Sequence, residues 1–200
     1  AQLQKGISFS MATELEVELA EALTRIVPCA EMVRFVKNGS DATSSAIRLA
    51  RAFTGRDLVA VCGYHGMQDW YIGSTTNRRG IPTDVCALTK TFVYNDPDSL
   101  KKLLAEYPGQ FAAVILEPIQ ADGPAEGYLE SLRELTQAAG ALLIFDEVVS
   151  GFRYALGGAS ELYKVTPDLA AFGKGMGNGL PISAVAGRAA VMELIGTQGV

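Results

Sequence analysis

The chain has 200 residues, of which 48% are hydrophobic and 20% charged, and its formal net charge is −5. These are the values of an ordinary globular domain with a sizeable core, and an acidic balance without Lys/Arg-rich runs argues against nucleic-acid binding. No apolar run is long enough to cross a membrane, and residues 1–30 lack a signal-peptide pattern. Three cysteines without metal-ligand spacing predict no metal site and favour reduced thiols in a cytoplasm.

The polar and apolar patterns predict several helices. Thr13 with Glu16 forms a capping-box pattern that opens a helix over residues 13–26. A second helix is expected over residues 40–53, with Phe53 turned inward and Gly55 as the stop. Further helices are predicted over residues 97–106, with Pro97 in the first turn, and over residues 128–139 and 189–195.

Short apolar runs between these helices predict strands. Strands that alternate with helices favour an α/β fold with a mainly parallel sheet and helices on both faces. In such folds, binding sites lie beyond the carboxyl ends of the strands. The expected strands cover residues 32–36, 58–62, 112–116, 142–145, 169–172 and 182–186.

Lys174 lies between two glycines after the apolar run 169–172, and Asp146 ends the run 142–145. One crossover between parallel strands brings such a lysine and carboxylate to neighbouring strand ends. Pyridoxal phosphate (PLP) requires this pair, because the amine forms a Schiff base with its aldehyde and the carboxylate keeps its pyridine nitrogen protonated. The alternatives are an exposed loop lysine and an aspartate that caps a strand.

Residues 172–181 match neither of two nucleotide-binding patterns. They do not form a P-loop, because no Gly-Lys-Ser/Thr stands at the required spacing. They do not form a GxGxxG fingerprint, because Asn178 replaces the last glycine and no helix pattern follows. The glycines are therefore expected to bring the backbone close to a cofactor and to leave Lys174 mobile.

Residues 38–40 join a predicted strand to the start of a helix. Gly39 would let the backbone approach a ligand closely, and the free N–H groups of the first turn with the Ser40 hydroxyl suit a phosphate group. Asn38 is a further donor. The alternative is an ordinary capped turn in which Ser40 is the N-cap residue.

Together these segments resemble the class III PLP-dependent aminotransferases, and most closely the glutamate-1-semialdehyde 2,1-aminomutase-like proteins. The resemblance implies a fold type I transferase, with residues 1–200 forming most of the large PLP-binding domain. It also implies an N-terminal segment and a C-terminal small domain outside these residues, and a homodimer in the full-length protein. The resemblance rests on residues 6–23, 31–42, 47–57, 63–66, 115–124 and 152–169.

The resemblance assigns roles to several of these residues. Tyr64 would stack on the PLP ring, and Val148 would pack on the opposite ring face. Asp146 would pair with the ring nitrogen, whereas its neighbour Glu147 would point the other way, toward scaffold contacts. Lys174 would carry the cofactor and move the substrate proton. Asn38, Gly39 and Ser40 would anchor the phosphate.

Three further residues are candidates for the substrate side of the site. Glu117 ends a predicted strand, and Asp122 holds the position at which some class III enzymes carry a glutamate. His65, the only histidine in the sequence, is expected to support its loop. A lone histidine without partners is a poor metal ligand.

The predicted activity is transfer of an amino group between an amine or amino acid and a carbonyl compound. A 2,1-aminomutase of the glutamate-1-semialdehyde type is the first alternative, although residues 60–63 lack the acidic residue that the aminomutases usually carry there. The second alternative is a non-catalytic PLP-binding paralogue or an inactive truncated domain.

Overall fold

The computed structural model describes residues 2–6, 9–197 and 200. Within these residues the strands are β1 (Met32–Val36), β2 (Leu58–Cys62), β3 (Thr89–Thr91), β4 (Phe111–Leu116), β5 (Leu142–Asp146), β6 (Leu169–Phe172) and β7 (Ser183–Gly187). The helices are α1 (Gln2–Lys5), α2 (Glu14–Ile26), α3 (Gly39–Thr54), α4 (Asp69–Ile72), α5 (Thr83–Ala87), α6 (Pro97–Glu106), α7 (Tyr128–Ala139), α8 (Gly158–Tyr163), α9 (Ala189–Met192) and α10 (Leu194–Thr197), with a 3-10 turn, η1 (Lys174–Met176).

The described strands form one sheet in the order β1-β7-β6-β5-β4-β2-β3. Neighbours from β6 to β3 are parallel, whereas β7 is antiparallel to both β6 and β1. Strand β1 therefore runs in the same direction as β6, and β7 is the one reversed strand in the described sheet. The carboxyl ends of all the others lie at one edge, which confirms the predicted mainly parallel α/β fold.

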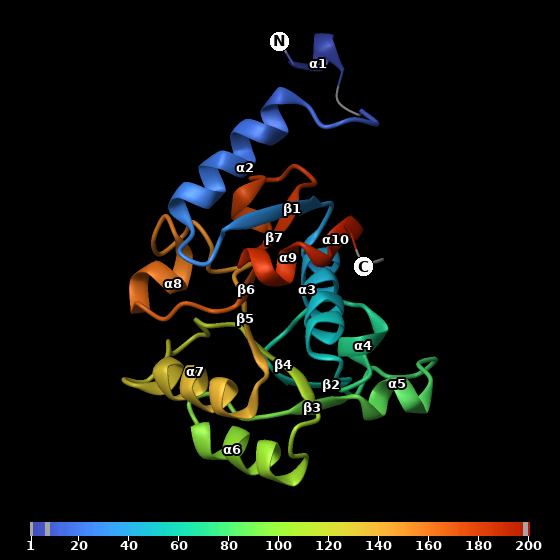
Figure 1. The fold of residues 1–200 in the computed structure, drawn as a ribbon, viewed down its shortest axis with the longest axis vertical. Helices are drawn as coiled ribbons and strands as arrows, with labels where there is room; N and C mark the ends of the chain where they lie inside the picture. The colour runs from blue at the N-terminus through green and yellow to red at the C-terminus, as the bar shows by residue number, and fades with distance from the viewer. Residues whose placement is uncertain (1, 7–8, 198–199) are drawn as a thin grey trace.

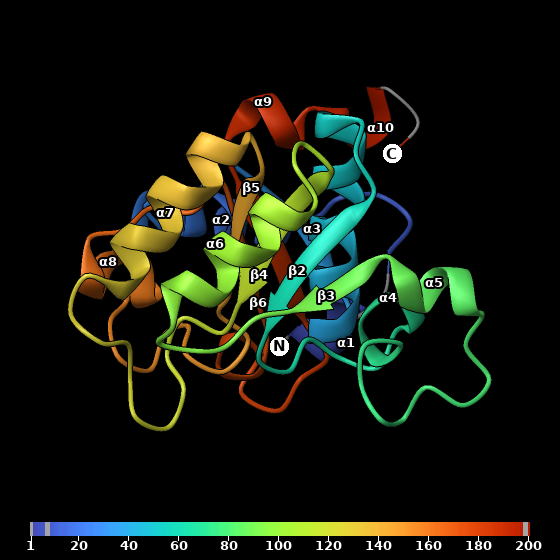
Figure 2. The same ribbon diagram turned by 90° about the horizontal axis from the view of Figure 1, so that it is seen from below.

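Helices cover both faces of the sheet, as Figures 1 and 2 show, with α3 on one side and α6 and α7 on the other. Apolar side chains of α3 pack on alternate residues of the strands, including Val59, Ile115 and Ile144. The intervening residues face α6 and α7, while α2 packs over β6 and β7 on that same side. The alternation places Asp146 on the α3 side, because it follows Ile144 by two residues.

The helix boundaries follow from their capping residues. Thr13 and Glu16 form the predicted capping box, and Gly55 and Gly140 end α3 and α7 in the left-handed conformation. The N-cap of α3 is Asn38, whose side chain accepts a hydrogen bond from the backbone of Asp41, so the alternative with Ser40 as N-cap is wrong.

The inward orientation predicted for Phe53 is wrong. Its side chain is 41% exposed and lies 5.1 Å beneath the Arg188 guanidinium. A cation over an aromatic ring stabilises an exposed side chain without burying it in the core.

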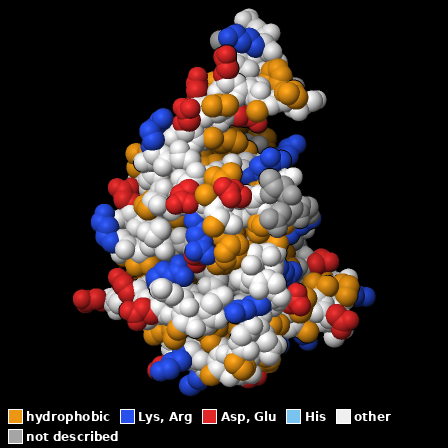
Figure 3. Space-filling model, viewed as in Figure 1, with side chains coloured by type: hydrophobic (Ala, Val, Ile, Leu, Met, Phe, Trp, Pro, Cys, Tyr) orange, Lys and Arg blue, Asp and Glu red, His pale blue; other side chains and the backbone are white. Residues whose placement is uncertain are grey.

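The N-terminal part projects from the rest of the molecule, because α1 and the start of α2 extend beyond the sheet (Figure 1). Several apolar side chains of this arm are exposed, namely Phe9, Met11, Leu15 and Val17. Acidic and basic side chains are scattered over the face in Figure 3, among patches of hydrophobic ones. Among the described residues, no helix is both long and apolar enough to cross a bilayer.

Candidate active site

A cavity of about 490 Å³ opens at the edge where the parallel strands end. Its walls come from the ends of β1, β2, β4 and β5, from the start of α3 and from the segment between β6 and β7. The position agrees with the rule that ligands bind beyond the carboxyl ends of such strands. The lining residues include Asn38, Gly39, Ser40, Tyr64, His65, Glu117, Asp146, Val148 and Lys174.

One end of the cavity is the N-terminus of α3. The Asn38 carboxamide accepts from the Asp41 backbone N–H at 3.0 Å and donates to the Asp41 carboxylate at 2.7 Å. The N–H groups of Gly39 and Ser40 have no acceptor within the helix. The Ser40 hydroxyl accepts from the Met67 backbone N–H at 3.3 Å, and its own proton can still be donated into the cavity.

Asp146 is held firmly at the end of β5. Its side chain is 4% exposed, one carboxylate oxygen lies 2.8 Å from Nδ1 of His65, and the other accepts from the Val148 backbone N–H at 3.1 Å. A buried carboxylate needs such partners to remain charged. Asp146 therefore presents a fixed acceptor to the cavity.

Glu147 points away from the cavity, as the sequence predicts. It is fully buried, and its carboxylate accepts from Ser150 Oγ and from the backbone N–H groups of Ala159 and Ser160. Burial raises the pKa of the Glu147 carboxyl, while these three hydrogen bonds act in the opposite direction. Glu147 thus fastens α8 to the end of β5.

Lys174 begins η1, although the sequence predicts a loop there. Its backbone is left-handed, with φ at 35°, and its side chain is exposed on the cavity wall with no ion pair among the described residues. Gly173 before it packs closely: a Cβ there would lie 2.9 Å from Ser183 Oγ and 3.3 Å from Val148. Close backbone packing therefore sets where the lysine leaves the strand.

Tyr64 and Glu117 form the part of the wall that follows the ends of β2 and β4. The Tyr64 backbone N–H donates to the Glu117 carboxylate at 2.9 Å, and the Tyr64 ring is 59% exposed. Gly63 has φ at 107° and passes so close to Glu117 that a Cβ would contact the carboxylate. The Tyr71 hydroxyl fixes the same turn by donating to the Gly63 carbonyl at 2.8 Å.

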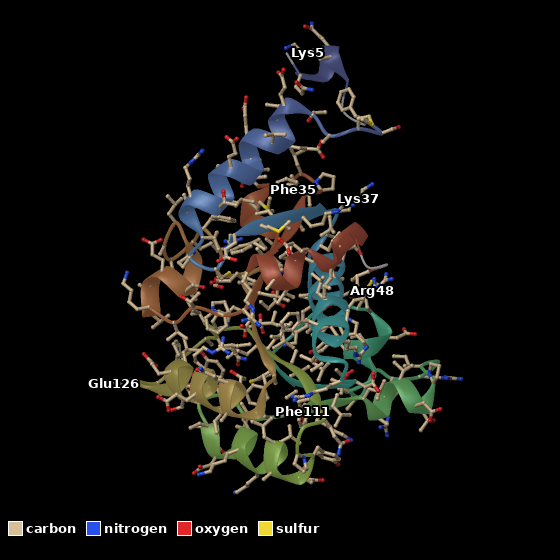
Figure 4. All side chains as sticks on the ribbon, viewed as in Figure 1. Lys5, Phe35, Lys37, Arg48, Phe111 and Glu126 are labelled. Carbon is tan, nitrogen blue, oxygen red and sulfur yellow. The ribbon has the colours of Figure 1, made fainter. Side chains whose placement is uncertain are left out.

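The structure thus gathers every candidate from the sequence except Asp122 around one cavity. Asp122 is exposed outside it. His65 lies beneath the site as the partner of Asp146, with its side chain fully buried. Sequence reasoning missed Lys37, which stands where β1 leads into α3 (Figure 4) and whose place beside Asn38 was the available signal. It also missed Thr43, Met67, Gln68, Val149, Leu180, Pro181, Ile182 and Ser183.

The fold and the lysine-aspartate cavity define an α/β transferase of fold type I. The family model for aminotransferase class-III matches residues 1–200, and the chain belongs to that enzyme family. A glutamate-1-semialdehyde 2,1-aminomutase of Citrifermentans bemidjiense is 44% identical over 214 residues, which cover 100% of this chain and 50% of that protein. The chain spans about half the length of the curated relatives it matches.

Solved structures give the same result. An omega-transaminase from Sphaerobacter thermophilus superposes with a TM-score of 0.89 at 38% identity, covering 99% of this chain and 50% of that one. A transaminase with PLP bound superposes with a TM-score of 0.91 at 34% identity, covering 98% of this chain and 50% of that one. At these identities the likeness extends from the fold to the family.

Proposed function

We propose that this chain provides the cofactor-binding part of a PLP-dependent aminotransferase. The observation that carries the proposal is the meeting of Lys174, Asp146 and the N-terminus of α3 in one cavity. These supply an amine, a buried carboxylate and a set of anion-binding N–H groups. PLP carries an aldehyde, a basic ring nitrogen and a phosphate, so each of its three reactive or charged groups has a counterpart.

The packing around the cavity fits this cofactor. Gly39 and Gly173 can both pack against Val148 only because they lack side chains. A Cβ at Gly39 would lie 2.9 Å from Val148, so any larger residue would fill the space beside the phosphate-binding N–H groups. Tyr64 and Val148 offer an aromatic and a branched apolar surface for the two faces of a flat ring.

When bound, PLP supplies an electron sink for negative charge at the reacting carbon. Lys174 would hold the cofactor through its amine, and the same amino group would take and return the substrate proton. Asp146 would accept a hydrogen bond from the ring nitrogen and keep that nitrogen protonated. Gly39 and Ser40 would donate to the phosphate through their N–H groups and the Ser40 hydroxyl.

A homodimer is part of the same proposal. Met11 on the N-terminal arm is 81% exposed, and Met67 and Leu180 at the cavity mouth are 73% and 75% exposed. Exposed apolar side chains at the mouth of a binding site and on a projecting arm are typical of a surface that a partner covers. A second copy of the chain would cover them and close the site from outside.

The three unpaired cysteines support a reducing, cytoplasmic location.

The test uses the full-length protein loaded with PLP. Borohydride should fix a pyridoxyl group on Lys174, found by peptide mass spectrometry, and Lys174→Ala should lose the visible absorbance and the activity. Lys164→Ala is the matched control, because Lys164 is also an exposed lysine with positive φ but lies outside the cavity. Label on another lysine, or an active Lys174→Ala protein, would refute the proposal.

The aminomutase remains the second candidate, because curated relatives with that name are 42–44% identical. The two activities differ in their substrates: a transaminase needs a separate amino donor and carbonyl acceptor, whereas the mutase converts glutamate-1-semialdehyde alone. Assays of the full-length protein with each set distinguish them. Turnover only with a donor and acceptor pair supports the transaminase, and turnover of glutamate-1-semialdehyde alone supports the mutase. PLP binding without either turnover would indicate the non-catalytic alternative.

A further inference from the structure

The imidazole of His65 occupies a closed compartment under Asp146. Its side chain is 0% exposed, and Nδ1 lies 2.8 Å from the Asp146 carboxylate. The Trp70 ring is nearly parallel to it at 6.4 Å between centroids, and the Tyr71 ring meets it at 73° and 5.2 Å. Aromatic walls on two sides leave the imidazole little freedom to turn.

The loop that carries His65 is held by other groups. The His65 carbonyl accepts from Thr43 Oγ1 at 2.8 Å, and the Tyr64 backbone is bonded to Glu117. The Tyr71 hydroxyl and the Ser40 side chain bind the turn on either side. These contacts use backbone groups of the loop and not the imidazole. Loop support, the role predicted from the sequence, therefore does not account for the side chain.

The hydrogen bonds also locate the imidazole proton. An ionised carboxylate can only accept, so Nδ1 of His65 is the donor to Asp146. Nε2 is buried and has no hydrogen-bond partner among the described residues. The Trp70 N–H is not free for it, because it donates to Ser44. A proton on Nε2 would be a buried donor without an acceptor, so the neutral form with hydrogen on Nδ1 is favoured.

We propose that His65 is a positioning residue that fixes the Asp146 carboxylate for the cofactor. The neutral imidazole holds one carboxylate oxygen and the Val148 N–H holds the other. These two hydrogen bonds together fix the orientation of the Asp146 carboxylate. Because the imidazole carries no charge, the negative charge of Asp146 remains available to a protonated ring nitrogen. The proposal rests on the proposed function. It assigns the positioning role to a residue that does not itself react with the cofactor or the substrate.

The test compares His65→Asn with His65→Leu in the full-length protein. An asparagine can still donate from near the Nδ1 position, whereas leucine fills the space without a donor. Leucine should weaken PLP binding about tenfold, and asparagine should restore most of it. In the loaded protein, leucine should also shift the pH dependence of the cofactor absorbance. The PLP dissociation constant is measured on the apoprotein, so it requires no turnover.

Tyr71→Phe is the control for a purely structural role. It removes the hydroxyl bond to the same turn but leaves the imidazole and Asp146 in place. It should lower the thermal stability without changing PLP affinity or the absorbance profile. If Tyr71→Phe changes PLP affinity and the absorbance profile as much as His65→Leu does, the role of His65 is structural and the proposal fails. It also fails if leucine binds PLP as wild type does, or if asparagine gives no rescue.

A second measurement tests the proton position, and it remains possible if His65→Leu does not fold. ¹⁵N-histidine labelling of the apoprotein, with His65→Asn to identify the signal, should show a protonated Nδ1 and a bare Nε2 at neutral pH. Protons on both nitrogens, or on Nε2 alone, would overturn the proposal. A wild-type protein that does not bind PLP would instead refute the proposed function, so the two failures are distinguishable.

Discussion

Gly39, at the start of α3, lies against Val148, just beyond the end of β5. A Cβ built on Gly39 would stand 2.9 Å from one Val148 methyl group and 3.1 Å from the other. Real Cβ atoms almost never come within 3.0 Å of another heavy atom, so the nearer methyl group would have to move. The contact joins the end of the cavity proposed to bind phosphate to the residue proposed to lie on the ring face, so a change in packing at one of them acts on the other.

Gly39→Ala should therefore lower both stability and PLP affinity. Overpacking of this kind costs about 1–3 kcal/mol, and the shifted Val148 would narrow the space for the ring. Urea unfolding of the apoprotein and a PLP titration measure the two effects. Adding Val148→Ala should recover stability, because it removes both methyl groups in contact. Equal losses in the single and double variants would mean that the contact is not the cause.

Asp146→Asn should lower PLP affinity at least as much as His65→Leu does, and at saturating PLP it should still reduce turnover by about 10²–10³-fold. The amide is nearly the same size as the carboxylate, yet it carries no charge to keep the ring nitrogen protonated. Steady-state kinetics of the loaded full-length protein measures the loss. Asp98→Asn, an exposed change on α6, should have no effect. Turnover within a few-fold of wild type would show that Asp146 does not pair with the ring nitrogen.

The sequence predicts the fold well because buried parallel strands produce continuous apolar runs. Strand β5 and helix α7 have almost no competing signal, and their predicted and observed ranges agree within one residue. The sequence did not predict β3 (Thr89–Thr91), a short edge strand of polar residues. The inward orientation predicted for Phe53 is wrong for a different reason. Its spacing matches the apolar face of α3, but it lies in the last turn of that helix, where its side chain is exposed.

The site could be predicted only in part, because motifs locate strand ends but not side-chain directions. Asp146 and Lys174 follow apolar runs, so they were found and do line one cavity. Asp122 lies on a loop after β4, whose path no local pattern specifies, and it falls outside. The burial of His65 depends on Trp70 and Tyr71, which fold back from the next helix. Such tertiary contacts cannot be recognised from the sequence around the histidine.

Glu147→Ala should destabilise the protein by about 2–4 kcal/mol, because two backbone N–H groups of α8 would lose their acceptor inside the core. Glu147→Gln should cost less, about 1 kcal/mol. Its amide oxygen can still accept from the backbone, and the Ser150 hydroxyl can rotate to accept from the amide N–H. Urea unfolding measures both. A glutamine variant as unstable as the alanine variant would show that the charge, and not the acceptor, holds α8.

The Cys29 thiol should make stability fall at alkaline pH. Burial raises the pKa of Cys29 to about 12, whereas an exposed thiol titrates near 9. The folded state thus binds a proton that the unfolded state releases. The stabilisation is fully present below pH 9 and is lost as pH rises toward 12, with a slope of up to about 1.4 kcal/mol per pH unit.

Cys29→Ala should remove this part of the pH dependence while lowering stability at neutral pH. The quantity to measure is the difference in free energy of unfolding between wild type and variant from pH 8 to pH 11, since other groups cancel in the difference. A difference that stays constant over this range would show that Cys29 is not protected from ionisation. Cys86, which is only half-buried, is the control position for the same substitution.

The N-terminal arm is the expected contact surface between two copies of the chain. Met11 is 81% exposed, and a side chain of this size contributes about 1.5–3 kcal/mol when it is buried. If the arm packs on a second copy, Met11→Glu in the full-length protein should raise the dimer dissociation constant at least about tenfold, because the interface would lose that burial and gain a charge.

Val93→Glu is the control, because Val93 is 60% exposed but precedes α6 at the opposite end of the molecule (Figure 1). Sedimentation velocity measures the association, and gel filtration shows whether PLP stays bound. A wild-type protein that is monomeric yet retains PLP and activity would refute the proposed dimer. A Met11→Glu protein that dimerises as tightly as the Val93→Glu control would place the interface elsewhere.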